Sequence, residues 1–441
     1  MSAPRPKWDP LLICVSGMVL TYVWRLHYLL PGPFLRLRPV VLVSAGALVL
    51  YLIDTDRRRS LAHLNHPVIK LLLALVLVMA LSIPGSLWPG ASFGLLRADF
   101  AKTVIFFFLL AASIRALIDI ERLAGVYVAG GALYALKVVL GSSRHGLGGY
   151  DPNDYSLILV CALPLAVYFV ARSRSSFARI LATIALLLMT AAVVKSGSRS
   201  GFIGLLAIGI YLLIAYRALS LKLRVGAVVV SLAGLLFVAS DSYWERMSTL
   251  LNPQEDYNWS GQSYGGRMEI WKRGIGYMLQ RPFLGVGLGS FRRAEGGLSV
   301  MAERWRPEGR GFKWSEPHNS FVEVGAELGF TGLIVFLLLI YEGFRALVRV
   351  ARPPPPGRRR SGRAAVAMAQ ALIAALIGYI VVGFFLSHAY TTVLYSILGI
   401  VVGMTKVTSG TGAAPRRTSG RVNARLPRSR ALQSSRSGPS Y

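Results

Sequence analysis

Residues 317–341 read PHNSFVEVGAELGFTGLIVFLLLIY, a polar start followed by an apolar run that begins at Gly329. With its flanks, the segment 318–345 is long enough to cross a bilayer, because a helical span takes about 20 mostly apolar residues. His318 stands at the edge of this predicted span, where a long polar segment ends. A titratable side chain at that position suggests that the polar segment carries a function.

The composition of the whole chain is typical of a membrane protein. Of its 441 residues, 54% are apolar and 16% are charged, and the mean hydropathy is +0.52. Backbone polar groups in lipid must be satisfied within their own segment, and no alternating β-barrel pattern occurs, so each apolar run is predicted to be a helix. The predicted fold is an all-α, multi-pass bundle of about twelve transmembrane helices, at 10–30, 39–53, 67–84, 98–115, 122–140, 155–171, 178–195, 200–217, 222–240, 318–345, 364–386 and 388–406.

These spans divide the chain into four parts. Residues 1–240 hold nine predicted spans, 241–317 form one long loop, 318–406 hold three more spans, and 407–441 form a basic tail predicted to be disordered. Lysine and arginine are concentrated in the connections on the side of the N-terminus, which places that side in the cytoplasm and the long loop outside. Most of the net charge of +29 is therefore a topology signal. Membrane lipids are predicted partners and nucleic acid is not.

Several other kinds of site are not predicted. Cys14 and Cys161 both fall within apolar spans and are interpreted as small core residues. The outward carboxylates are scattered and form no Asp-x-Asp pattern, so no metal and no other cofactor is predicted. The glycines at 285, 287 and 289 have no flanking strand, and we interpret them as a tight turn rather than a phosphate-binding loop.

Three basic side chains fall on the predicted outer side. Arg199 lies in KSGSRSGFIGLL, Arg267 begins a predicted helix in the long loop, and His318 precedes the span at 318–345. Singly, each has an ordinary explanation, such as an arginine that reaches the membrane interface. Together they indicate transfer from a lipid diphosphate, because guanidinium groups bind phosphate oxygens and stabilise a leaving group. The imidazole could take the proton from an attacking hydroxyl.

The helix predicted after Arg267 is amphipathic. Its apolar residues recur at helical spacing, which predicts a helix on the membrane surface or over the mouth of the bundle. These residues are Met268, Trp271, Ile275, Met278 and Leu279. The aromatic residues Tyr257, Trp259, Tyr264, Trp305 and Trp314 of the same loop could stack on sugars or form an interfacial belt.

Three segments in this order, SGSRSGFIGLL, GRMEIWKRGIGYMLQRPFLGVGLGSF and PHNSFVEVGAELGFTGLIVFLLLIY, resemble the O-antigen ligase and O-antigen polymerase superfamily, most closely over 196–340. The resemblance implies a GT-C-like helical bundle in the bacterial inner membrane, with the long loop and an active site facing the periplasm. It also implies a metal-independent, inverting glycosyltransferase whose donor is a glycan on undecaprenyl diphosphate. Carried over by position, Arg199 and Arg267 would contact the diphosphate, and His318 would activate the acceptor hydroxyl.

Four further residues are predicted substrate contacts. Asn153 and Asp154 lie in GGYDPNDYS, which could bind sugar hydroxyls or simply cap the following span. Glu316 could orient the imidazole of His318 or be solvated, and Asn319 follows the histidine directly.

The acceptor is left open. A ligase would use lipid A–core, a polymerase a lipid-linked glycan, and a protein O-oligosaccharyltransferase a serine or threonine. Of these, the ligase is favoured, with the polymerase almost level. A transporter of lipid-linked glycans is the alternative from another class, although the two halves of the chain show no internal repeat.

Overall fold

The structure is a computed structural model that describes residues 7–60, 65–141, 146–222, 224–226, 241–249, 252, 254, 256, 258–261, 263–299, 302, 314–352 and 359–409. Every regular element in these ranges is a helix or a helical turn, and they contain no strand. The predicted all-α fold is therefore confirmed.

Five helices are long and apolar enough to cross a membrane. Shorter apolar helices accompany them, and η5 (Leu95–Phe100) leads directly into α6 (Ala101–Ser113). The count of twelve spans stays a prediction, as does the outward placement of 241–317. Most of the ninth predicted span, 222–240, and of the tail at 407–441 lies outside the described residues. The five long helices are α7 (Leu117–Leu140), α8 (Pro152–Arg172), α9 (Ser176–Ser196), α16 (Ser320–Val350) and α17 (Arg359–Gly383).

Proline marks the start of many helices, because its missing N–H costs nothing in the first turn and its φ angle suits a helix. The apolar run predicted as a span at 10–30 does not form one helix. After α1 (Pro10–Met18) and the π-turn η1 (Val19–Val23), Arg25 adopts a left-handed backbone conformation with a φ of 52° and ends the helical run. The helices that begin at proline include α1 (Pro10–Met18), α3 (Pro39–Leu52), α4 (Pro67–Ser82), α5 (Pro89–Gly94) and α8.

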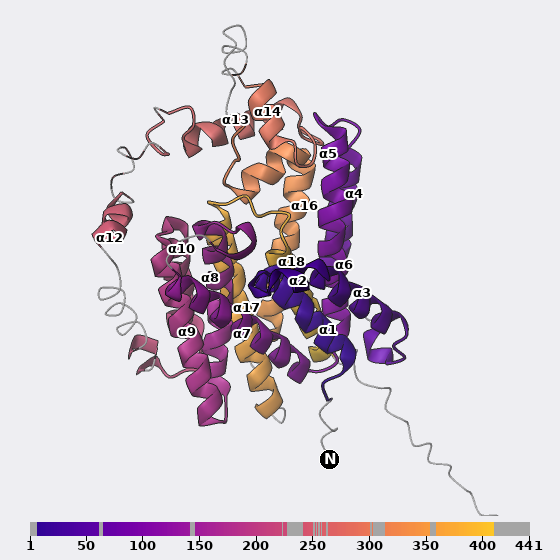
Figure 1. The fold of residues 1–441 in the computed structure, drawn as a ribbon, viewed down its shortest axis with the longest axis vertical. Coiled ribbons are helices and arrows are strands. Elements are labelled where there is room, and N and C mark those ends of the chain that lie inside the picture. The colour runs from indigo at the N-terminus through magenta and orange to yellow at the C-terminus, as the bar shows by residue number, and fades with distance from the viewer. Residues whose placement is uncertain are drawn as a thin grey trace, which may run out of the picture.

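The bundle is built around two helices. α8 packs against α7, α9, α17 and α10 (Arg199–Ala215), and α16 packs against α4, α17 and α18 (Thr392–Thr408). Two short helices of the predicted loop, α13 (Arg267–Gln280) and α14 (Phe291–Gly297), lie at the end of the bundle opposite to the N-terminus (Figure 1). α13 packs against α16, and this contact fixes the loop on the bundle.

The glycine series after α13 is structural. α16 is broken at Gly329, where a φ of 68° and a ψ of −169° interrupt the helix. The carbonyl oxygens of Ala326 and Glu327, freed by this break, accept hydrogen bonds from Val286 N at 2.9 Å and from Gly287 N at 3.0 Å. The tight turn predicted here is therefore a backbone clamp on the broken helix.

We expect Gly285→Ala to unfold this clamp. Gly285 has a φ of 63°, and a Cβ there would overlap the carbonyl groups of Ala326 and Glu327. Backbone cannot move aside cheaply, so the substitution should cost about 3 kcal/mol or more. Gly149→Ala is the matched control, since Gly149 also has a positive φ, 83°, but open space around it. Its cost should be only about 1 kcal/mol. Thermal unfolding in detergent compares the two, and equal midpoints would contradict the clamp.

The helix predicted after Arg267 is present as α13, and its placement on the membrane surface stays a prediction. Ile270, Gly274 and Tyr277 are buried, whereas Ile275 and Leu279 are exposed. Gly274 allows close approach, because a Cβ there would meet Val322 of α16 and Phe291 of α14. The helix thus packs on protein by one face and presents an apolar edge beside it.

Candidate functional site

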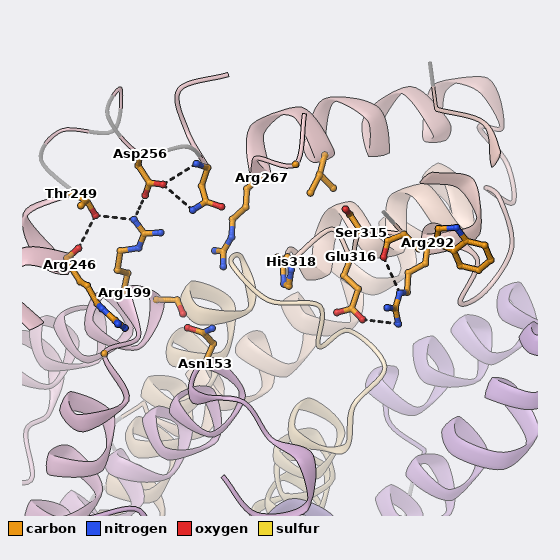
Figure 2. A pocket seen from close by; sticks show the side chains of 16 residues that line it. Asn153, Arg199, Arg246, Thr249, Asp256, Arg267, Arg292, Ser315, Glu316 and His318 are labelled. Atoms are coloured by element: carbon orange, nitrogen blue, oxygen red, sulfur yellow. Dashed lines mark hydrogen bonds and ion pairs between the residues drawn. The ribbon is translucent and has the colours of Figure 1, made fainter. Parts of the chain in front are cut away.

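The starts of four helices, α8, α10, α13 and α16, meet around one cavity of about 950 Å³ (Figure 2). The cavity brings together all three residues that the sequence predicts to be catalytic, Arg199, Arg267 and His318. Among the described residues, four arginines and two carboxylates line it, so its walls carry excess positive charge. The lining residues are Asn153, Gly197, Arg199, Ser200, Arg246, Thr249, Asp256, Asn258, Gly265, Arg267, Ile270, Arg292, Trp314, Ser315, Glu316 and His318.

Arg199 is placed by a tight turn between two helices. Gly197 ends α9 in the left-handed conformation, with a φ of 65°. Ser198 then caps α10 by accepting a hydrogen bond from Gly201 N at 3.1 Å. Arg199 is therefore the first residue of α10, at the cavity wall. The residues Gly-Ser before the arginine are thus what the chain needs to reverse direction there.

The guanidinium of Arg199 is held on one side. Its Nη1 forms an ion pair with Asp256 and donates to Thr249 Oγ1 at 2.9 Å. Asp256 in turn accepts hydrogen bonds of 2.9 Å from both the backbone N and the side-chain Nδ2 of Asn258. Burial raises the pKa of Asp256, but the hydrogen bonds from Asn258 and Arg199 outweigh it and keep the pKa below its ordinary value. The carboxylate is therefore ionised and orients Arg199.

Arg267 and His318 are tied to each other through a tryptophan. Arg267 is the first residue of α13, and Trp271 lies one turn further along this helix. The indole Nε1 of Trp271 donates to the carbonyl oxygen of Pro317 at 2.7 Å. This bond fixes the start of α13 beside the residue that precedes His318.

His318 has a strained backbone and a lowered pKa. Its φ of 45° lies in the left-handed region, which is uncommon for residues other than glycine but tolerated by histidine. Burial lowers the pKa of His318 below its ordinary value of 6.5, and the charge of Arg267 lowers it further. Glu316, Asp151 and Asp154 oppose this shift. The imidazole is neutral at pH 7 and can accept a proton.

The four predicted substrate contacts occupy different places. Asn153 and Glu316 line the cavity, and Asn153 Oδ1 accepts from Ser198 Oγ at 2.7 Å. Asp154 is part of a capping box with Asp151 at the start of α8. Asn319 caps α16, because its Oδ1 accepts from Phe321 N and Val322 N. Neither Asp154 nor Asn319 is among the lining residues. Roles for all four in substrate binding stay predictions.

A further histidine connects the helix starts. His388 Nε2 lies 2.8 Å from Asp154 Oδ1, and its backbone N donates to Ser320 Oγ at 3.0 Å. Ser320 begins α16 directly after Asn319, while Asp154 adjoins Asn153, which binds the Ser198 cap of α10. Hydrogen bonds thus run from the start of α16, through α8, to the start of α10. This network connects the starts of the two helices beside which His318 and Arg199 lie.

Sequence reasoning missed three charged residues of this cavity as members of the site: Arg246, Asp256 and Arg292. Each lies in the long loop among several similar charges, and no local spacing distinguishes it. His388 was also missed, because the two partners that link it to the helix starts, Ser320 and Asp154, lie more than 60 positions away in the sequence. Within the described ranges, no three His, Cys, Asp or Glu side chains group as metal ligands would.

Comparison with known proteins gives the same assignment as the sequence segments. Residues 184–337 match the family described as O-antigen ligase.

Two similar proteins carry the name "Putative polysaccharide ligase". The one from Rickettsia conorii is 34% identical over 92 residues, which is 20% of this chain. The one from Rickettsia prowazekii is 27% identical over 150 residues, or 33% of this chain. The chain aligns with 21% and 35%, respectively, of these relatives' own lengths. Residues 184–337 thus match the O-antigen ligase family, and this match and both relatives support the resemblance seen in the three segments.

Proposed function

We propose that the chain is a multi-pass membrane glycosyltransferase of the O-antigen ligase type. It moves a glycan from undecaprenyl diphosphate to an acceptor hydroxyl on lipid A–core, at the periplasmic face of the bacterial inner membrane. The observation that carries the proposal is the cavity in which Arg199, Arg267 and His318 meet. The family match at 184–337 and the apolar helices support it.

In this proposal the arginines hold the diphosphate of the donor. Arg199 is oriented by Asp256, and Arg267 points into the same cavity (Figure 2). Guanidinium groups stay charged at any physiological pH and bind phosphate oxygens in pairs. Their charge stabilises the diphosphate as it leaves, which is the role a metal ion plays in other transferases.

His318 acts as the general base. The acceptor oxygen attacks the anomeric carbon of the donor glycan as its proton passes to the neutral imidazole. The bond between that carbon and the phosphate oxygen breaks, and its electron pair leaves with the diphosphate. Attack opposite to the leaving group inverts the anomeric carbon. The lowered pKa of His318 keeps the base form available at neutral pH.

The test is transfer in proteoliposomes that contain an undecaprenyl-diphosphate glycan, with lipid A–core present or omitted. Product on lipid A–core alone supports the ligase. A ladder of longer donor-linked glycans without lipid A–core would make the chain a polymerase instead. No product in either arm from folded protein would overturn the proposal and favour a peptide acceptor or transport. Loss of rate in EDTA, restored by magnesium, would overturn the metal-free step.

The pH dependence of transfer should follow His318. Activity at saturating donor and acceptor should fall as the pH drops through the pKa of this residue, which lies below 6.5. Glu316 raises that pKa by stabilising the imidazolium. Glu316→Gln should therefore move the acid limb of the kcat profile to lower pH. A shift in the opposite direction would contradict the assignment of His318 as the base.

A further inference from the structure

His318 divides the cavity into two walls of different character. Arg199, Arg246 and Asn153 lie on one side of the imidazole, and Arg292 and Glu316 lie on the other (Figure 2). Both sides act on the histidine, since Arg267 lowers its pKa and Glu316 raises it. A base that serves two substrates has to stand between them, so the two walls suggest separate sites.

The first wall is suited to a diphosphate. Arg199 is fixed by Asp256 and Thr249. Arg246 lies against the same turn, because a Cβ on Gly197 would lie 3.2 Å from its Nη1. No carboxylate partner of Arg246 occurs among the described residues. Positive charge therefore exceeds negative charge on this wall.

The second wall carries one charge of each sign and an aromatic ring. Arg292 Nη1 and Glu316 Oε1 are 3.4 Å apart, and their side chains are 60% and 44% exposed. An ion pair this exposed contributes little to stability, so a ligand displaces it at little cost. The pair is close to neutral overall, in contrast to the first wall. It is therefore poorly suited to a diphosphate.

Trp314 completes the second wall. Its indole is seated on Gly296 of α14, where a Cβ would overlap the ring. The guanidinium of Arg293 lies 5.3 Å from the ring centroid, and Arg292 Nε donates to the Trp314 carbonyl at 3.4 Å. The side chain still is 42% exposed and lines the cavity. α14 thus holds an indole in place while leaving part of it open.

We infer that Arg292, Glu316 and Trp314 form the acceptor site and that its ligand is a sugar ring with neighbouring hydroxyls. The inference rests on the proposed function. Arginine only donates hydrogen bonds and a carboxylate only accepts them, so together they match hydroxyl groups, which do both. An indole face takes the C–H face of a sugar ring. A serine or threonine side chain would not cover the indole face of Trp314, and its single hydroxyl would not satisfy both Arg292 and Glu316.

Binding measurements on purified protein in detergent test this division. The probes are undecaprenyl diphosphate without sugar for the first wall, and lipid A–core or a free repeat-unit glycan without lipid and diphosphate for the second. A serine-containing peptide is the third acceptor arm. The variants are Trp314→Leu and Arg292→Gln, with Arg246→Gln as the matched control, because it removes an arginine from the opposite wall.

We expect Trp314→Leu and Arg292→Gln each to weaken glycan binding about tenfold while the Kd for undecaprenyl diphosphate changes less than about twofold. Arg246→Gln should instead weaken the binding of undecaprenyl diphosphate about tenfold, while glycan binding changes less than about twofold. The two glycan probes then distinguish a core acceptor from a repeat-unit acceptor.

Three outcomes would overturn the inference: unchanged glycan binding in both variants, loss of diphosphate binding in them as large as in Arg246→Gln, or binding of the peptide alone. Failure of the proposed function would give a different result from failure of this inference: the wild-type protein itself would not bind undecaprenyl diphosphate.

Discussion

Replacing His318 with asparagine should abolish transfer and leave the protein folded. Asparagine tolerates the left-handed backbone that His318 adopts at a φ of 45°. It has no group that takes up a proton near neutral pH, so the general base is lost. General-base catalysis contributes about 10²–10⁴-fold, and we expect transfer to fall by about that factor. Initial rates of transfer and the thermal unfolding midpoint in detergent measure the two effects.

The control for this prediction is a second left-handed residue outside the cavity. Arg38 has a φ of 49° at the start of α3 and does not line the cavity. Arg38→Asn should keep wild-type transfer. His318→Ala should lose transfer too, and also some stability, since alanine in the left-handed region costs about 1–2 kcal/mol. Transfer near the wild-type rate in His318→Asn would exclude the histidine as the base.

The sequence was sufficient to predict the elements that depend on local pattern. Apolar runs of helical length predicted the all-α fold, and the helix after Arg267 is present as α13. The sequence predicted residues 199, 267 and 318 to lie on one side of the membrane, and in the structure all three line one cavity. The side of the membrane stays a prediction. In each case a short-range signal, such as a helix start or a span edge, was enough.

Contacts between distant segments could not be predicted in this way. The apolar residues of α13 indicated a helix, yet Ile275 and Leu279 are exposed because Gly274 sets which face meets α16. Likewise, Asp256 was one of several outward carboxylates in the sequence, and only the fold shows that it binds Arg199. The partner of a charge is decided by packing, which a single sequence does not encode in its spacing.

Arg267→Lys and Arg199→Lys should each lower transfer by about 10²–10³-fold, although both keep the positive charge. At position 199 a lysine has one nitrogen, which Asp256 and Thr249 would occupy as they now occupy Nη1, so little would be left for phosphate. At position 267 the charge that lowers the pKa of His318 is kept, and the expected loss comes from the paired guanidinium contacts to the diphosphate. Arg281→Lys is the matched control, because Arg281 follows α13, donates to the Gly85 carbonyl and does not line the cavity. Steady-state transfer rates and unfolding midpoints should show a loss of kcat/KM without a loss of stability. Wild-type rates from both cavity variants would show that paired guanidinium contacts to the diphosphate are not needed.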